Sequence, residues 1–245
     1  GEQIIDNFSP DYVIPFKVPK NQVMDAFQKF SKKPLTPKDF SCDRVVDKMQ
    51  GVYIPFWLYS GNCEGSITAE GINTRTWTSG NYRYTEKKYY SVYRNGTLDF
   101  KAVPVDASSK TDDDAMDSIE PFDYSEMTAF NPGYLSERYD EDKDKCLPRA
   151  KERIENTTRD ELRNTCNYNS VNVQSYEKHT EIKDVKYAML PTWLLYTTYQ
   201  DKPYFFAMNG QTGKFIGNLP ISKGKLVAYS LLGGVGGYII GAILQ

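Results

Sequence analysis

The hydrophobic pattern of the chain changes from a helical period to a strand period. Val23, Phe27 and Phe30 are spaced like one face of a helix, and a strand is predicted before them over 12–18. Residues 52–105 are instead rich in Tyr, Thr, Trp and Val, as half-buried strands are. This order predicts a short strand and a helix, followed by a meander of antiparallel strands.

Glycine-containing turn signals divide the strand-rich stretch at Gly61, Gly80-Asn81 and Asn95-Gly96. Asn95-Gly96 is the strongest of these signals, because both central positions of a type I′ turn need positive φ. Turns are therefore expected at all three places.

The second half of the chain alternates helical and strand-like segments. A short helix is predicted to begin near Asp113 and a longer one to span about 142–166, with strands over 171–176 and 185–199. The pattern as a whole predicts an α+β fold, with helices packed against a curved antiparallel sheet, in a domain over 1–222.

Two further turns are predicted near the end of this domain. Gln200-Asp201-Lys202 separates two strand-like runs, and so does the hexapeptide Asn209-Gly210-Gln211-Thr212-Gly213-Lys214. Asn and Gly tolerate the positive φ of a tight reversal, so the hexapeptide is interpreted as a rigid turn. An anion-binding loop is the alternative interpretation, but residues 215–220 are a poor helix start.

The last part of the chain, residues 226–245, has no charged side chain. A helix of this length spans about 30 Å, the thickness of a bilayer core. We therefore expect 223–245 to be a transmembrane anchor. Gly233, Gly237 and Gly241 are spaced by four residues, which favours helix–helix association in the bilayer. A buried core helix and a glycine-rich tail are the alternatives.

Lys223 and Lys225 stand just before this apolar run, and positively charged flanks tend to stay in the cytoplasm. The sequence therefore predicts a protein of the cell membrane whose globular domain is cytoplasmic. The chain starts at Gly1 without a signal-peptide pattern, so we also expect its native N-terminus to lie upstream.

The four cysteines, Cys42, Cys63, Cys146 and Cys166, include no C-x-x-C pair. Zinc ribbons and redox motifs need such closely spaced pairs, so neither a metal site nor a disulfide framework is expected. Buried thiols are the simpler interpretation.

Composition narrows the remaining chemistry. The net charge of −2 disfavours a dedicated nucleic-acid binder, and the single histidine, His179, leaves little imidazole for catalysis. His179 lies in a polar stretch and is expected to be an exposed loop residue. Two acidic runs in 102–145 are expected to be solvated helix starts or loops, with a cation site as the alternative: Asp112-Asp113-Asp114, and Asp140, Glu141, Asp142 and Asp144.

Two groups of aromatic residues allow a functional interpretation beside a structural one. Trp57 and Trp193 each follow a proline by two residues in a strand-like run, which predicts bent strands with core aromatics or a ligand groove lined by both. The Tyr- and Arg-rich stretch over 75–90 is expected to alternate aromatics inside and charge outside. Stacking of nucleic-acid bases is its alternative.

Five segments carry a resemblance to a known family. They are DYVIPFK (11–17), GVYIPFWL (51–58), VPVDASSK (103–110), SIEPFD (118–123) and FAMNGQTGK (206–214). In this order they look like the body of bacterial membrane-anchored proteins that contain TFIIB-type zinc ribbons. The resemblance implies that zinc is bound only by ribbons preceding the first segment, which this sequence lacks. It implies no catalytic residue, and no zinc ligand among the residues present.

The resemblance also implies a partner, because related Bacillus-type proteins are associated with flotillin-like SPFH-domain proteins and envelope-stress systems. The sequence therefore predicts a non-enzymatic, membrane-tethered cytoplasmic binding or scaffold protein without a cofactor of its own. A nucleic-acid-binding regulator that uses the missing ribbons, and a hydrolase with an unrecognised site, are the alternatives. Without the ribbons, nucleic acid is not expected as a partner.

Overall fold

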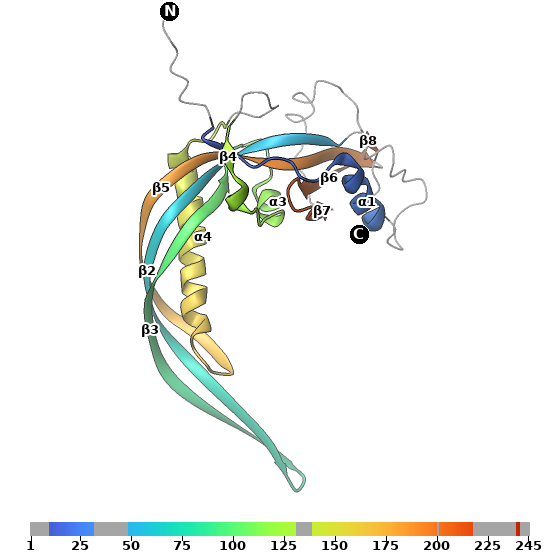
Figure 1. Ribbon diagram of the computed structural model, residues 1–245. Helices are drawn as coiled ribbons and strands as arrows, with labels where there is room; N and C mark the ends of the chain where they lie inside the picture. The colour runs from blue at the N-terminus through green and yellow to red at the C-terminus, as the bar shows by residue number, and fades with distance from the viewer. Residues whose placement is uncertain (1–9, 32–48, 131–138, 200, 218–238, 241–245) are drawn as a thin grey trace, which may run out of the picture. The chain divides into compact units, whose positions relative to one another are not determined.

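The computed structural model describes residues 10–31, 49–130, 139–199, 201–217 and 239–240 of the chain (Figure 1). Its strands are β1 Tyr12–Val13, β2 Gln50–Ser79, β3 Tyr82–Asp106, β4 Thr128–Ala129, β5 Ser170–Tyr199, β6 Lys202–Asn209, β7 Phe215–Gly217 and β8 Ile239–Ile240. Its helices are α1 Lys20–Ser31, α3 Asp113–Ser118, α4 Lys143–Asn164 and the 3₁₀ turn η1 Tyr124–Glu126.

The chain forms two compact units. Unit 1 comprises Gly1–Trp57, Val105–Cys146 and Lys186–Gln245, and unit 2 comprises Leu58–Pro104 and Leu147–Val185. The long strands β2, β3 and β5 contribute residues to both units.

Strands predominate over helices in the described residues, and their sheet is mixed. The strand order is β3-β2-β5-β1-β4, with β6 and β8 also pairing with β5 and with β7 pairing with β6. β1 and β8 run parallel to β5, whereas β6 runs antiparallel to it. The predicted α+β fold on a curved antiparallel sheet is therefore wrong. Parallel pairs join segments far apart in sequence, which the pattern of local turns does not reveal.

The predicted transmembrane anchor over 223–245 is also wrong. Among helices in the described part of the chain, none combines the length and apolar character needed to cross a membrane. Ile239–Ile240, inside the predicted anchor, form β8 beside Thr197 and Thr198 of β5. Five glycines in 226–245 lower its helix propensity, and Ile favours strands. The predicted localisation, in the cell membrane with a cytoplasmic domain, is inferred from this anchor and is therefore wrong as well.

In unit 1, α1 packs through the apolar face that the sequence predicts. Val23 and Phe27 are fully buried, and Phe30 is partly buried beside them. The ring of Phe27 meets that of Phe206 on β6 edge to face, with centroids 5.0 Å apart. The predicted helix is confirmed, whereas the strand predicted over 12–18 is reduced to the two residues of β1.

In unit 2, α4 lies along one face of the sheet formed by β3, β2 and β5 (Figure 1). The helix predicted over 142–166 is thereby confirmed. Buried apolar residues from the helix and all three strands form the core between them: Ile67, Ala69, Val92, Leu162, Cys166 and Val171. β5 is one continuous strand where the sequence predicts two.

A glycine allows β2 and β5 to approach each other closely. A Cβ at Gly61 would lie 2.0 Å from the carbonyl oxygen of Glu181. Gly61 is therefore needed for strand packing, and the turn predicted there is wrong.

The other turn signals have different outcomes. Gly80-Asn81 joins β2 to β3 as predicted, and Gly80 has a φ of +62° at the first central position, as in a type II′ turn. Asn95-Gly96 lies inside β3, so the turn predicted there is wrong. Asp201 has a φ of +61° between β5 and β6, so the chain reverses there as predicted, whereas Gln200 lies outside the described residues.

Candidate functional site

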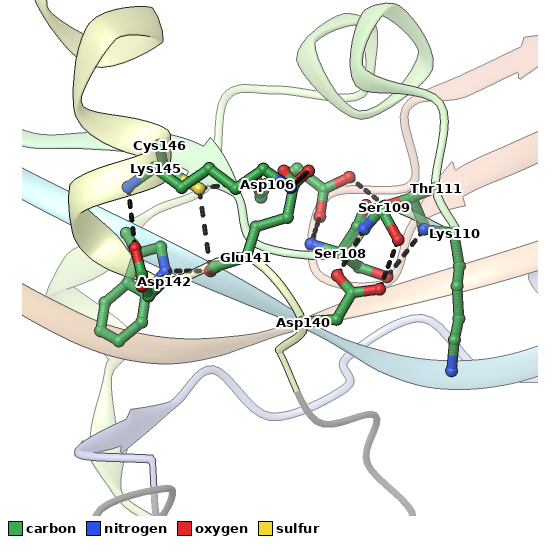
Figure 2. A network of polar contacts seen from close by, with 11 residues as sticks. Asp106, Ser108, Ser109, Lys110, Thr111, Asp140, Glu141, Asp142, Lys145 and Cys146 are labelled. Carbon is green, nitrogen blue, oxygen red and sulfur yellow. Dashed lines mark hydrogen bonds and ion pairs between the residues drawn. The ribbon is translucent and has the colours of Figure 1, made fainter.

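A network of polar contacts in unit 1 joins the end of β3 to the start of α4 (Figure 2). The fully buried Asp106 accepts hydrogen bonds from the backbone N–H of Ser108, at 2.9 Å, and from the hydroxyl of Thr111. Ser109 donates to the carboxylate of Asp140 through its backbone N–H, at 2.7 Å, and through its hydroxyl. Charge-assisted bonds of this kind fix the loop between the two elements.

The same network includes the first turn of α4. Trp57 donates its indole N–H to the carbonyl oxygen of Glu141 at 2.8 Å, and the Glu141 carboxylate lies 3.0 Å from the ammonium of Lys145. The hydrogen bond and the negative charge of Glu141 raise the pKa of Lys145. The buried Cys146 thiol donates to the carbonyl oxygen of Asp106 at 3.6 Å.

These contacts fix the loop, and in the described residues none of them places a histidine or a lysine beside the hydroxyl of Ser109. A serine nucleophile needs a neighbouring base that takes its proton, and His and Lys are the usual bases. The hydroxyl of Ser109 instead donates to a carboxylate, and Figure 2 shows the ammonium of Lys110 pointing away from both serines.

A second polar cluster in unit 1 surrounds the buried side chain of Asn209. Its amide N–H₂ donates to the carbonyl oxygens of Ile119, at 2.9 Å, and Pro121, at 3.2 Å. Its amide oxygen accepts the backbone N–H groups of Gln211, at 2.9 Å, and Thr212, at 3.0 Å. The four contacts use the full hydrogen-bonding capacity of the amide.

The hexapeptide that starts at Asn209 is the predicted turn. It leads from β6 into β7, and Gly213 has a φ of +82°. Gly210 has a different purpose, because a Cβ there would lie 2.6 Å from the Phe16 ring. β7 follows where an anion-binding loop would need a helix, so the turn interpretation is confirmed.

The turn also docks onto another of the segments that carry the family resemblance. Gln211 exchanges hydrogen bonds with the backbone of Asp123, at 2.7 and 3.0 Å, and the Lys214 ammonium donates to the Glu120 carbonyl oxygen at 2.7 Å. The structure thus brings 118–123 and 206–214 together.

The two tryptophans predicted as a groove have separate surroundings in unit 1. The ring of Trp57 lies 4.9 Å from that of Tyr139 and 5.1 Å from that of Tyr187. Trp193 donates its indole N–H to the Val18 carbonyl oxygen at 2.9 Å and packs against Phe16. Their described contacts have no residue in common, and a ligand groove lined by both stays a prediction.

The remaining predicted residues are distributed over the chain. His179 is exposed as predicted, but it lies within β5 and not in a loop. It lines an open hollow of about 540 Å³ in unit 2 with residues that include Glu64, Tyr93, Asn95 and Glu177.

Three of the four cysteines, Cys63, Cys146 and Cys166, are buried. Cys42 lies outside the described residues, and so do Gly233, Gly237 and Gly241. The predicted packing of these glycines in a bilayer required the transmembrane helix over 223–245, which the structure contradicts.

An exposed aromatic surface lies where the sequence is interpreted as favouring buried rings. It lies on the hairpin of β2 and β3 over residues 72–94, here called the arm, whose tip extends beyond the last turn of α4 (Figure 1). The exposed fractions of its aromatic residues are 40% for Trp77, 71% for Tyr82, 45% for Tyr84, 61% for Tyr89, 40% for Tyr90 and 61% for Tyr93. The prediction that the aromatics of this stretch point inside is therefore wrong.

The arm combines these aromatics with positive charge. Trp77 and Tyr84 stack across the two strands with centroids 5.6 Å apart, and the Arg75 guanidinium lies 5.3 Å from the Trp77 ring. Residues 72–94 contain five basic side chains and one acidic one, Glu86, which lies 3.4 Å from Lys88.

One signal in the sequence could have located this surface. In a half-buried strand, large apolar residues occupy alternate positions. On β3 the aromatics instead fall on both parities, with Tyr82, Tyr84 and Tyr90 at even numbers and Tyr89 and Tyr93 at odd ones. Because α4 can cover only one face of the strand, aromatic residues on both faces leave some of the rings uncovered.

The fold and the surface together define a predominantly β-stranded protein with an aromatic, basic hairpin. The chain is 37% identical over 235 residues to the uncharacterized protein YdjG of Bacillus subtilis (strain 168), covering 94% of this chain and 69% of that protein. The chain therefore belongs to the same family as YdjG. No family model and no solved structure matches it. The resemblance to zinc-ribbon-containing proteins stays a prediction.

Proposed function

We propose that the chain is a non-enzymatic protein-binding scaffold that uses the arm as its docking surface. The observation that carries this proposal is the set of six exposed aromatic rings on one hairpin. Exposed apolar patches mark interaction sites, and the stacked rings of Trp77 and Tyr84 form such a patch on one face of the hairpin. Tyr, Trp and Arg are also enriched in protein interfaces. Tyr and Trp have only two side-chain torsions each, so little side-chain entropy is lost when a partner covers them.

The charge of unit 2 favours a protein partner over nucleic acid. Arg75 beside the stacked Trp77 and Tyr84 could support bases, as in single-strand binders. Unit 2 as a whole contains 13 basic and 11 acidic residues, however, whereas nucleic-acid-binding domains are usually strongly basic. The resemblance makes an SPFH-domain protein the first partner to test.

Site-specific photocrosslinking in cells tests the proposal. A benzophenone amino acid replaces Tyr82 or Tyr89 on the arm, and Asn156, an exposed residue of α4, serves as the control position. We expect a protein to be crosslinked from both arm positions and not from Asn156. The crosslinked protein is identified by mass spectrometry and is then purified for binding measurements beside an SPFH-domain protein.

Two results would contradict parts of the proposal. If the arm positions crosslink no protein, the arm is not the docking surface. If the arm crosslinks a protein but a purified SPFH-domain protein does not bind, the surface stands and the partner implied by the resemblance is wrong.

A further inference from the structure

We infer that the partner segment is an extended acidic peptide, which adds to the outer edge of β3 as a further strand. This inference rests on the proposed function, because it specifies how the arm binds. In the described part of the chain β3 pairs with β2 alone, so its other side is an edge of the sheet. A strand edge presents a row of backbone N–H and C=O groups that an extended segment can pair with.

The geometry of the turn identifies the residues of this edge. β2 ends at Ser79 and β3 begins at Tyr82, so the turn has two residues and Ser79 and Tyr82 close the hairpin. The closing pair of such a hairpin exchanges both backbone hydrogen bonds, and the same pattern recurs at every second residue. Even-numbered residues of the arm therefore bond to β2, and odd-numbered residues present their backbone groups to the edge.

A side-chain contact agrees with this assignment. The carbonyl oxygen of Tyr93, an odd-numbered residue, accepts a hydrogen bond from the guanidinium of Arg94 at 2.9 Å. Nearer the body of unit 2, the guanidinium of Arg153 on α4 donates to the carbonyl oxygen of Pro104. The stretch open to a partner is therefore 83–91, the part of the strand that precedes these two arginine contacts.

Charge determines which occupant fits this edge. Residues 83–91 contain Arg83, Lys87 and Lys88 against the single acidic residue Glu86. Two copies of this stretch would each bring three cations and one anion, a net charge of +2, into the pairing, and like charges on neighbouring strands destabilise a strand pair. Lysines on an edge strand are a known protection against self-pairing. Acidic side chains on a foreign strand would turn the same repulsion into attraction.

The aromatic rings provide the remaining contacts. Side chains of an added strand alternate between the two faces of the sheet, next to those of β3. Tyr84 and Tyr90 lie on one face and Tyr89 on the other, so both faces offer an exposed ring. This explains why the aromatics of β3 occur on both parities, which packing against α4 does not require.

A pair of variants at one position isolates the backbone contribution. Ser91 is exposed and odd-numbered. Ser91→Pro removes an edge N–H without removing a hydrogen bond to β2, and Ser91→Ala is the matched control that keeps the N–H. The probe is a blocked, fluorescent peptide that alternates glutamate with valine, and a lysine–valine peptide is its control. Binding is measured by anisotropy at low ionic strength, and circular dichroism checks that each variant folds.

We expect the glutamate peptide to bind and the lysine peptide not to. Ser91→Pro should weaken binding about tenfold, the effect of losing one well-formed hydrogen bond, and Ser91→Ala should not. If Ser91→Pro fails to fold, Arg83→Glu with Lys87→Glu replaces it, and this variant should bind the lysine peptide instead.

Each opposite result overturns the inference and leaves the proposed function separately testable. Equal binding to Ser91→Pro and Ser91→Ala would exclude strand addition, and absence of glutamate-peptide binding would exclude the acidic occupant. A dimer of the unliganded chain that Ser91→Pro dissociates would assign the edge to a second copy. Binding of oligothymidylate in preference to the peptide would assign it to nucleic acid. Photocrosslinking from Tyr82 and Tyr89 decides independently whether the arm binds protein at all.

Discussion

The turn at Asn209 in unit 1 and the turn at Gly80-Asn81 in the arm of unit 2 differ in how they are stabilised. In unit 1 the turn at Asn209 is fastened by a buried amide that makes four hydrogen bonds to two segments. The arm reverses at Gly80-Asn81, and its tip residue Tyr82 is 71% exposed. Buried polar groups are costly unless satisfied, so unit 1 tolerates few changes, whereas the arm tolerates many. Six exposed aromatic residues on such a tolerant surface are therefore better explained by binding than by folding.

The largest expected effect lies at the body of unit 2, where the arm is rooted. Gly61→Ala places a methyl group 2.0 Å from the Glu181 carbonyl oxygen, so β2 and β5 must separate locally. We expect a loss of about 3 kcal/mol in the free energy of unfolding, at the upper end for overpacking. Gly96→Ala is the control, because its Cβ would lie 3.5 Å from a Leu162 methyl, an ordinary contact. Hydrogen exchange that is equally fast in both variants would contradict this account.

Asn209→Ala should have the next largest effect, and in unit 1. It leaves the carbonyl oxygens of Ile119 and Pro121 without the amide donor and removes the acceptor for two backbone N–H groups. Stranding buried polar groups costs roughly 2–3 kcal/mol, which denaturant unfolding measures. Lys214→Ala removes only an exposed donor to Glu120 and should change stability by less than about 0.5 kcal/mol. Similar losses in the two variants would show that Asn209 is not the fastening residue.

A smaller effect is expected from the backbone of the same turn. Gly213 has a φ of +82°, so Gly213→Ala should lower stability by about 1 kcal/mol. Gly213→Asn is the control, since Asn adopts positive φ more readily. Thermal unfolding should therefore rank Gly213 above Asn and Asn above Ala. Any other order would point to a side-chain clash as the cause.

The smallest effect is confined to alkaline solution and concerns Tyr176, in the body of unit 2. Burial, followed by the neighbouring Cys63 and Glu155, raises the pKa of Tyr176 to about 12 from its usual value near 10. The folded state then holds this proton more tightly than the unfolded state. Its contribution is complete below pH 10 and is lost as the pH rises from about 10 towards 12. Denaturant midpoints should fall more steeply over this range in the wild type than in Tyr176→Phe, and parallel curves would contradict the assignment.

Local patterns were sufficient to predict α1, α4 and the turn at Asn209. The helices have one apolar face and defined starts, and the turn stands between two strongly apolar runs, so neighbours in sequence determine each of them. The buried contacts of Asn209 with Ile119 and Pro121 were beyond reach, because nothing near Asn209 in the sequence indicates which distant carbonyl groups it meets.

Pairing between strands, which local sequence patterns do not show, explains the predictions that were wrong. Asn95-Gly96 has the sequence of a turn but is held in β3 by pairing with β2, which overrides a local preference. The apolar run that ends the chain has the length of a membrane helix, yet Ile239–Ile240 pair with β5. The exposure of the arm was not predicted as the first choice, because its aromatics were assigned to a core that α4 is too short to provide.

The labelling rates of the buried thiols can report how readily each unit opens. Cys63 and Cys166 belong to unit 2, and Cys146 belongs to unit 1. A buried thiol reacts with an alkylating reagent only when its surroundings open, so its labelling rate reports the local free energy of opening. Mass spectrometry of the three peptides after timed alkylation would follow both units in one sample. No reporter residue has to be introduced, and the intact chain can be compared with and without a partner on the arm.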